Sequence, residues 1–209
     1  MKKFLDKLKE HFADDEGIQD AVRLIELKLK QNPFPKASAT SSGDAGEFPL
    51  PQQLDEGNLF LFTDGACRGN PGPGAWGAMA QDHNGEIVFE ASHFNDHTTN
   101  NIMELTAVLA GLEQLEEDFP NAAELSIHVY SDSKYVVDGM KSWVAGWKRR
   151  GWKKADNKVP NNVEIWQALD KIKDNFADVK FYWVKGHSGH PQNERVDQLA
   201  NIALDSAGF

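Results

Sequence analysis

Cysteine is almost absent from this chain of 209 residues, which contains only Cys67. A single cysteine excludes an internal disulfide and any metal site built from several thiolates, and it agrees with a reducing compartment. Long apolar runs are also missing, since no stretch approaches the roughly 18 residues of a membrane span. Charged residues Lys2, Lys3 and Asp6 stand where a signal peptide needs an apolar core. We therefore expect a cytoplasmic protein that does not enter a membrane.

Basic side chains are nearly missing from the middle of the chain. Residues 58–133 contain one basic side chain, Arg68, and twelve acidic ones, whereas residues 134–158 contain eight basic and two acidic ones. The net charge of −10 therefore hides two regions of opposite sign. The acidic region is expected to attract cations and the basic region phosphates, so the global charge does not exclude a nucleic-acid partner.

The length allows one main domain with an appendage. Residues 1–31 carry two apolar stripes at helical spacing and are predicted to form a helical extension, arranged as a hairpin. Residues 32–57 are rich in Pro, Ser and Gly and are predicted to form a flexible linker. The main domain is expected over 58–209 as a monomer. The stripes of the extension need burial, so 1–31 is expected either to dock on the main domain or to mediate self-association or partner docking.

The order of predicted elements in the main domain indicates an α/β fold. A buried strand over 58–63 is expected to end at Asp64 and turn at Gly65. Two short segments, Gly74–Gln81 and Gly85–Ser92, joined by Asp82-His83-Asn84-Gly85, predict an antiparallel hairpin. The further elements then alternate as in crossover units: helix 101–117, strand 124–130, helical stretches 133–150 and 161–174, strand 179–184 and helix 193–206. We expect a mixed five-stranded sheet, with strands 1–3 antiparallel and the later strands parallel, and helices on both faces.

Four carboxylates stand beside apolar elements. Asp64 and Asp132 follow predicted strands, and Glu104 and Asp197 lie with the apolar stripes of two predicted helices. Unpaired charges are costly there unless cations neutralise them. Mg²⁺ prefers such oxygen ligands, and two ions on one site can drive phosphodiester hydrolysis. For each carboxylate alone, a surface group or a helix cap is the alternative; their convergence is a prediction about folding.

Several motifs follow one another in a specific order: Phe62-Thr63-Asp64-Gly65, Thr98-Thr99-Asn100-Asn101, Ser131-Asp132-Ser133, Trp183-Val184-Lys185-Gly186-His187-Ser188-Gly189-His190 and Asn193-Glu194-Arg195-Val196-Asp197. Together they resemble type 1 ribonuclease H, the endonucleases that cut the RNA strand of RNA–DNA hybrids. The resemblance runs from about Leu59 to Leu204. It implies the ribonuclease H-like fold, two Mg²⁺ ions with Mn²⁺ as a substitute, 5′-phosphate and 3′-hydroxyl products, and removal of RNA primers and R-loops.

The resemblance also assigns roles to residues at the predicted metal site. It makes Asp64, Glu104, Asp132 and Asp197 the metal ligands and His187 the group that assists proton transfer or product release. Glycines flank His187, as expected of a movable group. A solvated loop histidine is the alternative for His187 and the expectation for His190.

Substrate contacts follow from the same resemblance. The hybrid is expected to be read in its minor groove and gripped at its DNA phosphates by Cys67, Asn70, Thr99, Asn100, Asn101, Lys134, Trp143, Trp147, Lys148, Arg149, Arg150, Lys153 and Lys154. The last seven belong to the basic segment 141–154, where cations are interleaved with tryptophans, a pattern that suits phosphates and sugar faces together. The alternatives are turn chemistry for the glycine-rich stretch 65–77, a helix cap for the paired asparagines, core packing for at least one tryptophan and a solvated charge run for the cations.

Two other functions remain open. A non-catalytic hybrid-binding module would keep the groove without chemistry, but it has no reason to bear the repulsion of four carboxylates. The fold is also shared with integrases, resolvases and some exonucleases, which use clustered carboxylates. The basic segment and the asparagine pair favour the hybrid nuclease.

Overall fold

The structure is a computed structural model that describes residues 55–209. The predicted extension 1–31 and all but the last residues of the predicted linker 32–57 lie outside this part. The described strands and α-helices are β1 (Asn58–Cys67), β2 (Gly72–Gln81), β3 (Ile87–Thr98), α3 (Asn100–Asp118), β4 (Ser126–Ser131), α4 (Lys134–Asp138), α5 (Val144–Arg149), α6 (Val163–Ile172), β5 (Asp178–Trp183) and α7 (Pro191–Ser206). A π-helical turn, Gly139–Trp143, joins α4 to α5, and short 3₁₀ turns occur at Ala122–Glu124 and Lys173–Asn175.

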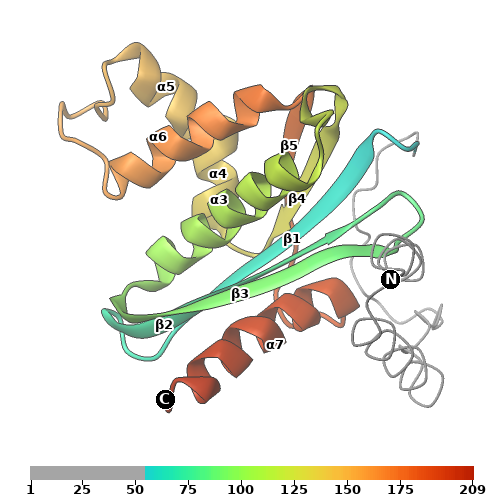
Figure 1. Ribbon diagram of the computed structural model, residues 1–209. Coiled ribbons are helices and arrows are strands. Elements are labelled where there is room, and N and C mark those ends of the chain that lie inside the picture. Colours follow the sequence, from blue (N-terminus) through green and yellow to red (C-terminus); the bar gives the residue numbers. More distant parts are fainter. Residues whose placement is uncertain (1–54) are drawn as a thin grey trace, which may run out of the picture. The chain divides into compact units, whose positions relative to one another are not determined.

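The five strands form one sheet in the order β3-β2-β1-β4-β5 (Figure 1). The first three strands are antiparallel, and β1, β4 and β5 are parallel, as the sequence predicts. Thr63 of β1 lies opposite Ser131 of β4, so the residues that follow them, Asp64 and Asp132, are neighbours across the sheet. The sheet register thus brings two predicted metal ligands together.

Helices cover both faces of the sheet because side chains alternate along its central strand. Leu61 points into the main core, which it shares with Leu105 of α3 and Trp166 of α6. Phe62 points to the opposite face and shares a second core with Val196 of α7. Alternation along β1 therefore fixes α3 and α7 on opposite faces, and both helices carry a predicted metal ligand.

Two glycines let these helices approach the sheet closely. A Cβ on Gly65 would lie 2.4 Å from the backbone nitrogen of Glu104, and a Cβ on Gly77 would lie 2.3 Å from the carbonyl oxygen of Val196. The predicted turn at Gly65 is wrong, because β1 continues through it to Cys67. The stretch 65–77 is likewise mostly strand, and the turn between β1 and β2 is short. Gly65 is needed for close packing and not for a turn.

The end of α7 that precedes Asp197 is tied to the edge strand β3 by a bidentate ion pair. Arg195 Nε and Nη2 each lie 2.7 Å from a carboxylate oxygen of Glu90. Such paired hydrogen bonds fix geometry as well as supply energy. Within residues 55–209, no helix has both the length and the hydrophobicity to cross a membrane.

Candidate active site

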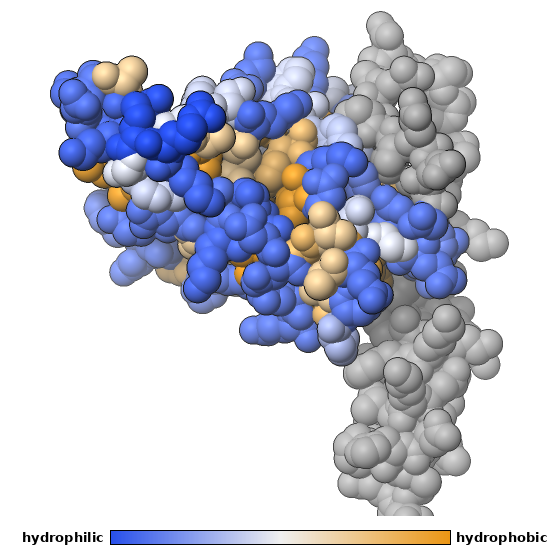
Figure 2. Space-filling view, turned by 90° about the horizontal axis from the view of Figure 1, so that it is seen from above, coloured by the Kyte–Doolittle hydropathy of each residue, from blue (hydrophilic) through white to orange (hydrophobic). Residues whose placement is uncertain are grey.

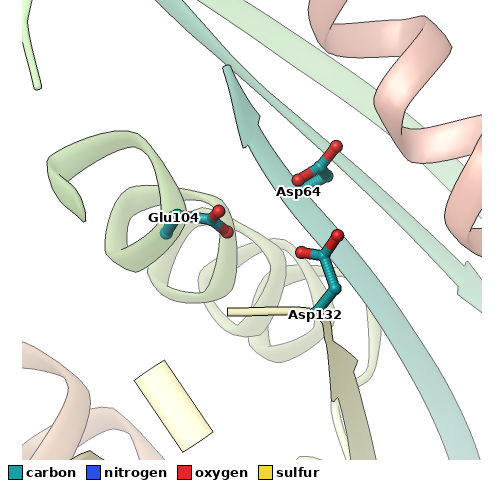
Figure 3. A group of neighbouring side chains, drawn as sticks. All are labelled: Asp64, Glu104 and Asp132. Atoms are coloured by element: carbon teal, nitrogen blue, oxygen red, sulfur yellow. The ribbon is translucent and has the colours of Figure 1, made fainter. Parts of the chain in front are cut away.

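Three of the four predicted carboxylates converge at one place. Asp64 of β1, Glu104 of α3 and Asp132, directly after β4, each offer an oxygen within 4.8 Å of the others. Figure 3 shows the carboxylates of Asp64 and Asp132 side by side, with Glu104 reaching toward them from α3. Asp64 and Glu104 are buried, and Asp132 is partly buried. Two strands and one helix therefore build a compact acidic site.

The backbone around Asp132 is held in place from β5 and from the loop that follows it. Trp183 Nε1 donates a hydrogen bond to the backbone oxygen of Asp132 at 2.9 Å. A Cβ on Gly186 would lie 2.3 Å from Asp132 Oδ2, so the loop reaches the carboxylate only because this residue is glycine. The loop after β5 thus completes one wall of the site.

Burial and mutual repulsion make the three carboxylates hard to ionise. Burial, and then repulsion from Asp132, raises the pKa of Asp64 to about 7, although the Gly65 N–H donates to its Oδ1 at 2.8 Å. Burial, and then repulsion from Asp64 and Asp132, raises the pKa of Glu104 well above its usual range. Burial also raises the pKa of Asp132, against the opposing effects of the Asn193 amide and the His187 charge. Ionising these carboxylates is therefore unfavourable in the metal-free protein, and a bound cation would relieve their mutual repulsion.

Glu104 shows how the site fits such a cation. Its Oε1 accepts a hydrogen bond from Asn100 Nδ2 at 3.3 Å, and the backbone nitrogen of Asn100 donates to Asn70 Oδ1 at 3.2 Å. Its Oε2 is buried and has no hydrogen-bond partner among the described residues. A buried carboxylate oxygen without a partner, close to two further carboxylates, is a suitable donor set for a divalent cation.

Asp197 stands at the edge of this group. It lies outside the set of three whose oxygens are within 4.8 Å, but its charge and a side-chain hydrogen bond both raise the pKa of Asp64. Asn201, one helical turn further along α7, donates from Nδ2 to the Asp197 backbone oxygen at 2.9 Å and to Oδ1 at 3.0 Å. The fourth predicted ligand is therefore adjacent to Asp64 and is held from its own helix.

The two loop histidines differ. His187 is exposed between two glycines and has a positive φ of 50°, a strained conformation of the kind that often marks a functional loop. Its charge acts on Asp132. His190 is buried at the start of α7, so the expectation of a solvated histidine at that position is wrong.

The predicted groove readers gather around the start of α3. Thr99 is the N-cap of α3, where its Oγ1 accepts a hydrogen bond from the Ile102 N–H at 3.3 Å, so neither Asn100 nor Asn101 is the cap. Asn101 is exposed on the first turn. Cys67, at the end of β1, is partly exposed, and its Sγ contacts the backbone oxygens of the turn that contains Asn70. These residues form one surface beside Glu104.

Lys134 lies two residues after Asp132, at the start of α4. Its Nζ is 4.7 Å from the ring centroid of Trp183, which is 43% exposed. A cation over a tryptophan face is favourable and keeps the charge at the surface. Trp183, absent from the predicted site residues, therefore both orients Lys134 and supports the Asp132 backbone.

The basic segment 141–154 divides into a packed part and an exposed part. Trp147 is only 8% exposed and packs edge-on against Trp166 of α6, so it belongs to the core, which favours the packing alternative for this tryptophan over its predicted contact with substrate. Trp143 is 37% exposed. The cations Arg149, Arg150 and Lys153 are exposed, and Lys154 is partly exposed. Figure 2 shows a predominantly hydrophilic surface over the α5 end of the molecule.

Lys148 has a structural role beside its predicted one. Its Nζ lies 2.7 Å from Oδ2 of the buried Asp170, whose other oxygen lies 3.5 Å from Lys173. Substitution Lys148→Met is expected to lower the free energy of unfolding by about 1–2 kcal/mol, because a buried carboxylate loses its nearest partner. Urea denaturation measures this. Lys153→Met, at an exposed position, is the control; equal stability of the two variants would contradict the pair's role.

The structure adds two polar residues that sequence reasoning missed. Asn193 is 4% exposed and its side chain bonds to Asp132, and Asn201 bonds to Asp197. Both lie four residues from Asp197, so their spacing on a predicted helix could have indicated that they share its face.

The mixed sheet, the helices on both faces and the carboxylate cluster define the class of this protein as an α/β protein with a site suited to divalent cations. The RNase H family matches residues 56–205. Ribonuclease H of Rhizobium meliloti is 47% identical over 148 residues, which cover 71% of this chain and 91% of that protein. Ribonuclease H of Agrobacterium fabrum is 48% identical over 148 residues, which cover 71% and 95%. The chain belongs to the ribonuclease H family.

Solved structures agree with the sequence comparison. LC11-RNase H1, determined in complex with an RNA/DNA hybrid, has a TM-score of 0.58 and 29% sequence identity, covering 71% of this chain and 98% of that chain. The family and the fold predicted from the motifs are therefore confirmed.

Proposed function

We propose that this protein is an endonuclease that hydrolyses the RNA strand of RNA–DNA hybrids. The observation that carries the proposal is the group of three carboxylates within 4.8 Å, one of which has a buried oxygen without a partner, in a chain of the ribonuclease H family. The hybrid bound by the similar LC11-RNase H1 supports the choice of substrate. The family resemblance further suggests 5′-phosphate and 3′-hydroxyl products, and roles in removing RNA primers and R-loops.

Asp64, Glu104, Asp132 and Asp197 would hold two Mg²⁺ ions, for which Mn²⁺ could substitute. Bound divalent cations supply polarisation of the phosphate oxygens and a lowered pKa of the attacking water. The protein's part is to hold the carboxylates rigidly around one point despite their repulsion. Burial of Asp64 and Glu104 also lowers the local dielectric, which strengthens every charge interaction at the site.

His187 is suited to move a proton at the rim of the site. It is exposed, and it is near enough to Asp132 for their charges to interact. A histidine side chain in such a position can assist proton transfer as a general acid or base. Its glycine neighbours permit the loop to bring the imidazole toward the leaving group.

The surface around Asn70, Asn100 and Asn101 would read the hybrid in its minor groove, where 2′-hydroxyl groups are displayed. Thr99 and Cys67 belong to the same surface, and Lys134 would contact the hybrid from the start of α4. The exposed cations of segment 141–154, together with Trp143, would grip DNA phosphates and sugars. Recognition by shape and backbone is expected, without base specificity.

Cleavage of defined duplexes tests the proposal. The protein is incubated with a labelled RNA annealed to DNA, in Mg²⁺ and in chelator, beside all-RNA and all-DNA duplexes. We expect metal-dependent cutting of the RNA in the hybrid only. Hybrid binding without cutting would instead support the non-catalytic binding module, and cutting of duplex DNA would support another nuclease activity of this fold.

A further inference from the structure

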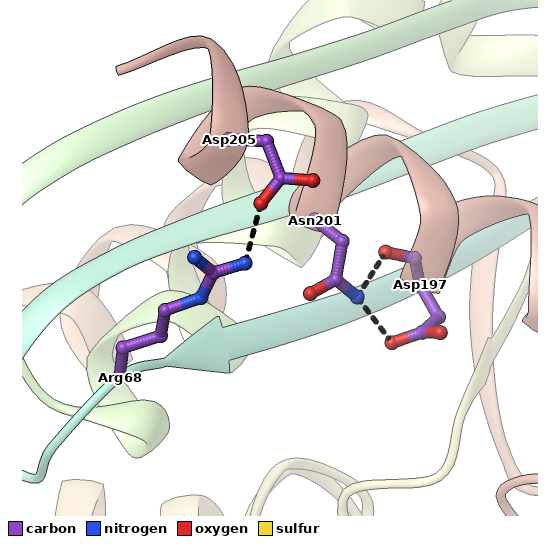
Figure 4. Close-up of polar contacts among 4 residues, drawn as sticks. All are labelled: Arg68, Asp197, Asn201 and Asp205. Carbon is purple, nitrogen blue, oxygen red and sulfur yellow. Dashed lines mark hydrogen bonds and ion pairs between the residues drawn. The ribbon is translucent and has the colours of Figure 1, made fainter. Parts of the chain in front are cut away.

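Helix α7 presents a row of four polar side chains toward the site and the β1–β2 turn. Residues 193, 197, 201 and 205 are each four positions apart, so they lie above one another on one face. Asn193 bonds to Asp132, Asp197 to Asp64, Asn201 to Asp197, and Asp205 pairs with Arg68 at 2.5 Å. Figure 4 shows the last part of this row, with Asn201 between Asp197 and Asp205.

Within this row, Asn201 controls the orientation of the carboxylate. The side chain uses one amide nitrogen for two acceptors, the backbone oxygen and Oδ1 of Asp197. The bond to the backbone anchors the amide on the helix, and the bond to Oδ1 then fixes the rotation of the carboxylate. Only the nitrogen of the amide can donate to both atoms, which settles the orientation of the Asn201 side chain.

Asp197 needs such an anchor because it stands outside the compact group of three carboxylates. The hydrogen bonds that hold it on its own helix come from Asn201. Without a restraint, rotation of its side chain would carry the charge away from the site. An amide restrains the carboxylate while leaving its charge intact, whereas a lysine or arginine would neutralise it. Asp197 is thereby held without a cationic side chain that would compete with a bound metal ion.

We propose that Asn201 is a positioning residue that holds Asp197 in the orientation required for cation binding. The proposal rests on the assignment of Asp197 as a metal ligand in the proposed function. Partners that orient a ligand from outside the coordination shell typically contribute 10–100-fold to metal affinity or activity. The residues that support the metal site therefore include Asn201, one helical turn beyond the ligand Asp197 on α7.

Binding of Mn²⁺ alone to the full-length protein, followed by electron paramagnetic resonance of the free ion, tests this role. Asn201→Leu keeps the approximate shape and removes both donor bonds. We expect its dissociation constant for Mn²⁺ to rise about tenfold. The Mg²⁺ concentration for half-maximal hybrid cleavage should rise by a similar factor, with an unchanged KM for the hybrid. Asp205→Asn, which removes the Arg68 pair on the same row, should leave both quantities within twofold of the wild type.

The outcomes separate positioning from mere stabilisation. If Asn201→Leu lowers the midpoint of thermal unfolding but binds Mn²⁺ like the wild type, the proposal is overturned. Asn201→Ala, which favours helix and suits a half-buried position, gives the same test should the leucine variant fail to fold. A third outcome separates the two proposals. If the wild type binds Mn²⁺ more tightly than Asn201→Leu and Asn201→Ala but cuts no hybrid, the positioning role of Asn201 stands and the proposed function is wrong.

Discussion

Asp64→Asn is expected to reduce hybrid cleavage by at least about a thousandfold and, in chelator, to make the protein more stable than the wild type at neutral pH. The loss of activity follows from removing a charge at the centre of the cation site. The gain in stability follows because that charge is buried beside Asp132, where repulsion is unrelieved without metal. The substitution is therefore expected to lower activity and to raise stability at the same time.

The pH dependence gives the sign of the stability effect. The pKa of Asp64 is about 7 in the folded protein against an ordinary value of 3.8. A carboxyl whose pKa is raised by folding contributes its full stability below pH 4, and that contribution is lost as pH rises through 7. The loss is of the order of 4 kcal/mol. Metal-free wild type should therefore lose stability between pH 4 and 8 relative to Asp64→Asn, and added Mg²⁺ should restore the wild type.

Thermal unfolding in chelator across this pH range measures the difference. Asp82→Asn is the matched control, since Asp82 lies on the exposed hairpin. Partial burial alone would raise the pKa of Asp82. Hydrogen bonds from the Glu86 and Asn84 N–H groups outweigh this effect and lower the pKa. Its replacement should lower stability at neutral pH and spare cleavage. If metal-free Asp64→Asn is less stable than the metal-free wild type at pH 8, the ionised Asp64 does not destabilise the folded protein and the prediction is wrong.

The sequence predicted the mixed sheet, with three antiparallel strands followed by parallel ones, and it singled out the three carboxylates that lie together in the acidic site. It did so because β1 and β4 are apolar runs with a carboxylate directly after the paired segment, and parallel pairing places such residues side by side. The full length of β1 was not predicted. Glycine is common in turns, so Gly65 was expected to end the strand, and the packing of α3 against Gly65 is a tertiary contact that a local pattern does not reveal. The full length of β3 was missed because its last part, Asn95-Asp96-His97, lacks apolar alternation.

The roles of single side chains were harder to predict where two functions compete for one residue. Trp147 and Trp143 are four positions apart in a basic segment, yet one packs in the core and the other remains partly exposed. That choice depends on Trp166, which lies 19 positions further along the chain from Trp147 and packs against it. Lys148 likewise pairs with Asp170 of α6. Contacts between distant segments decide these roles, and a local pattern cannot reveal them.

Gly65→Ala tests whether the close approach of α3 to β1 sets the geometry of the site. The new Cβ would lie 2.4 Å from the Glu104 nitrogen and 2.7 Å from the Met103 carbonyl carbon, and both are backbone atoms that cannot turn aside. Relief requires α3 to move away from β1, which separates Glu104 from Asp64. We expect a loss of about 3 kcal/mol in the free energy of unfolding.

Activity should fall further than stability alone explains. A displacement of one ångström at catalytic groups can cost about a hundredfold, so the folded fraction of Gly65→Ala should cleave hybrid about a hundredfold more slowly. Gly146→Ala is the control, because its Cβ would meet only the movable Arg150 guanidinium, 3.3 Å away, within a helix that alanine favours. Stability of that variant should equal or exceed the wild type by up to about 1 kcal/mol. Wild-type stability and cleavage in Gly65→Ala would mean that α3 tolerates displacement, and that the carboxylates find their positions by some means other than the packing of helix on strand.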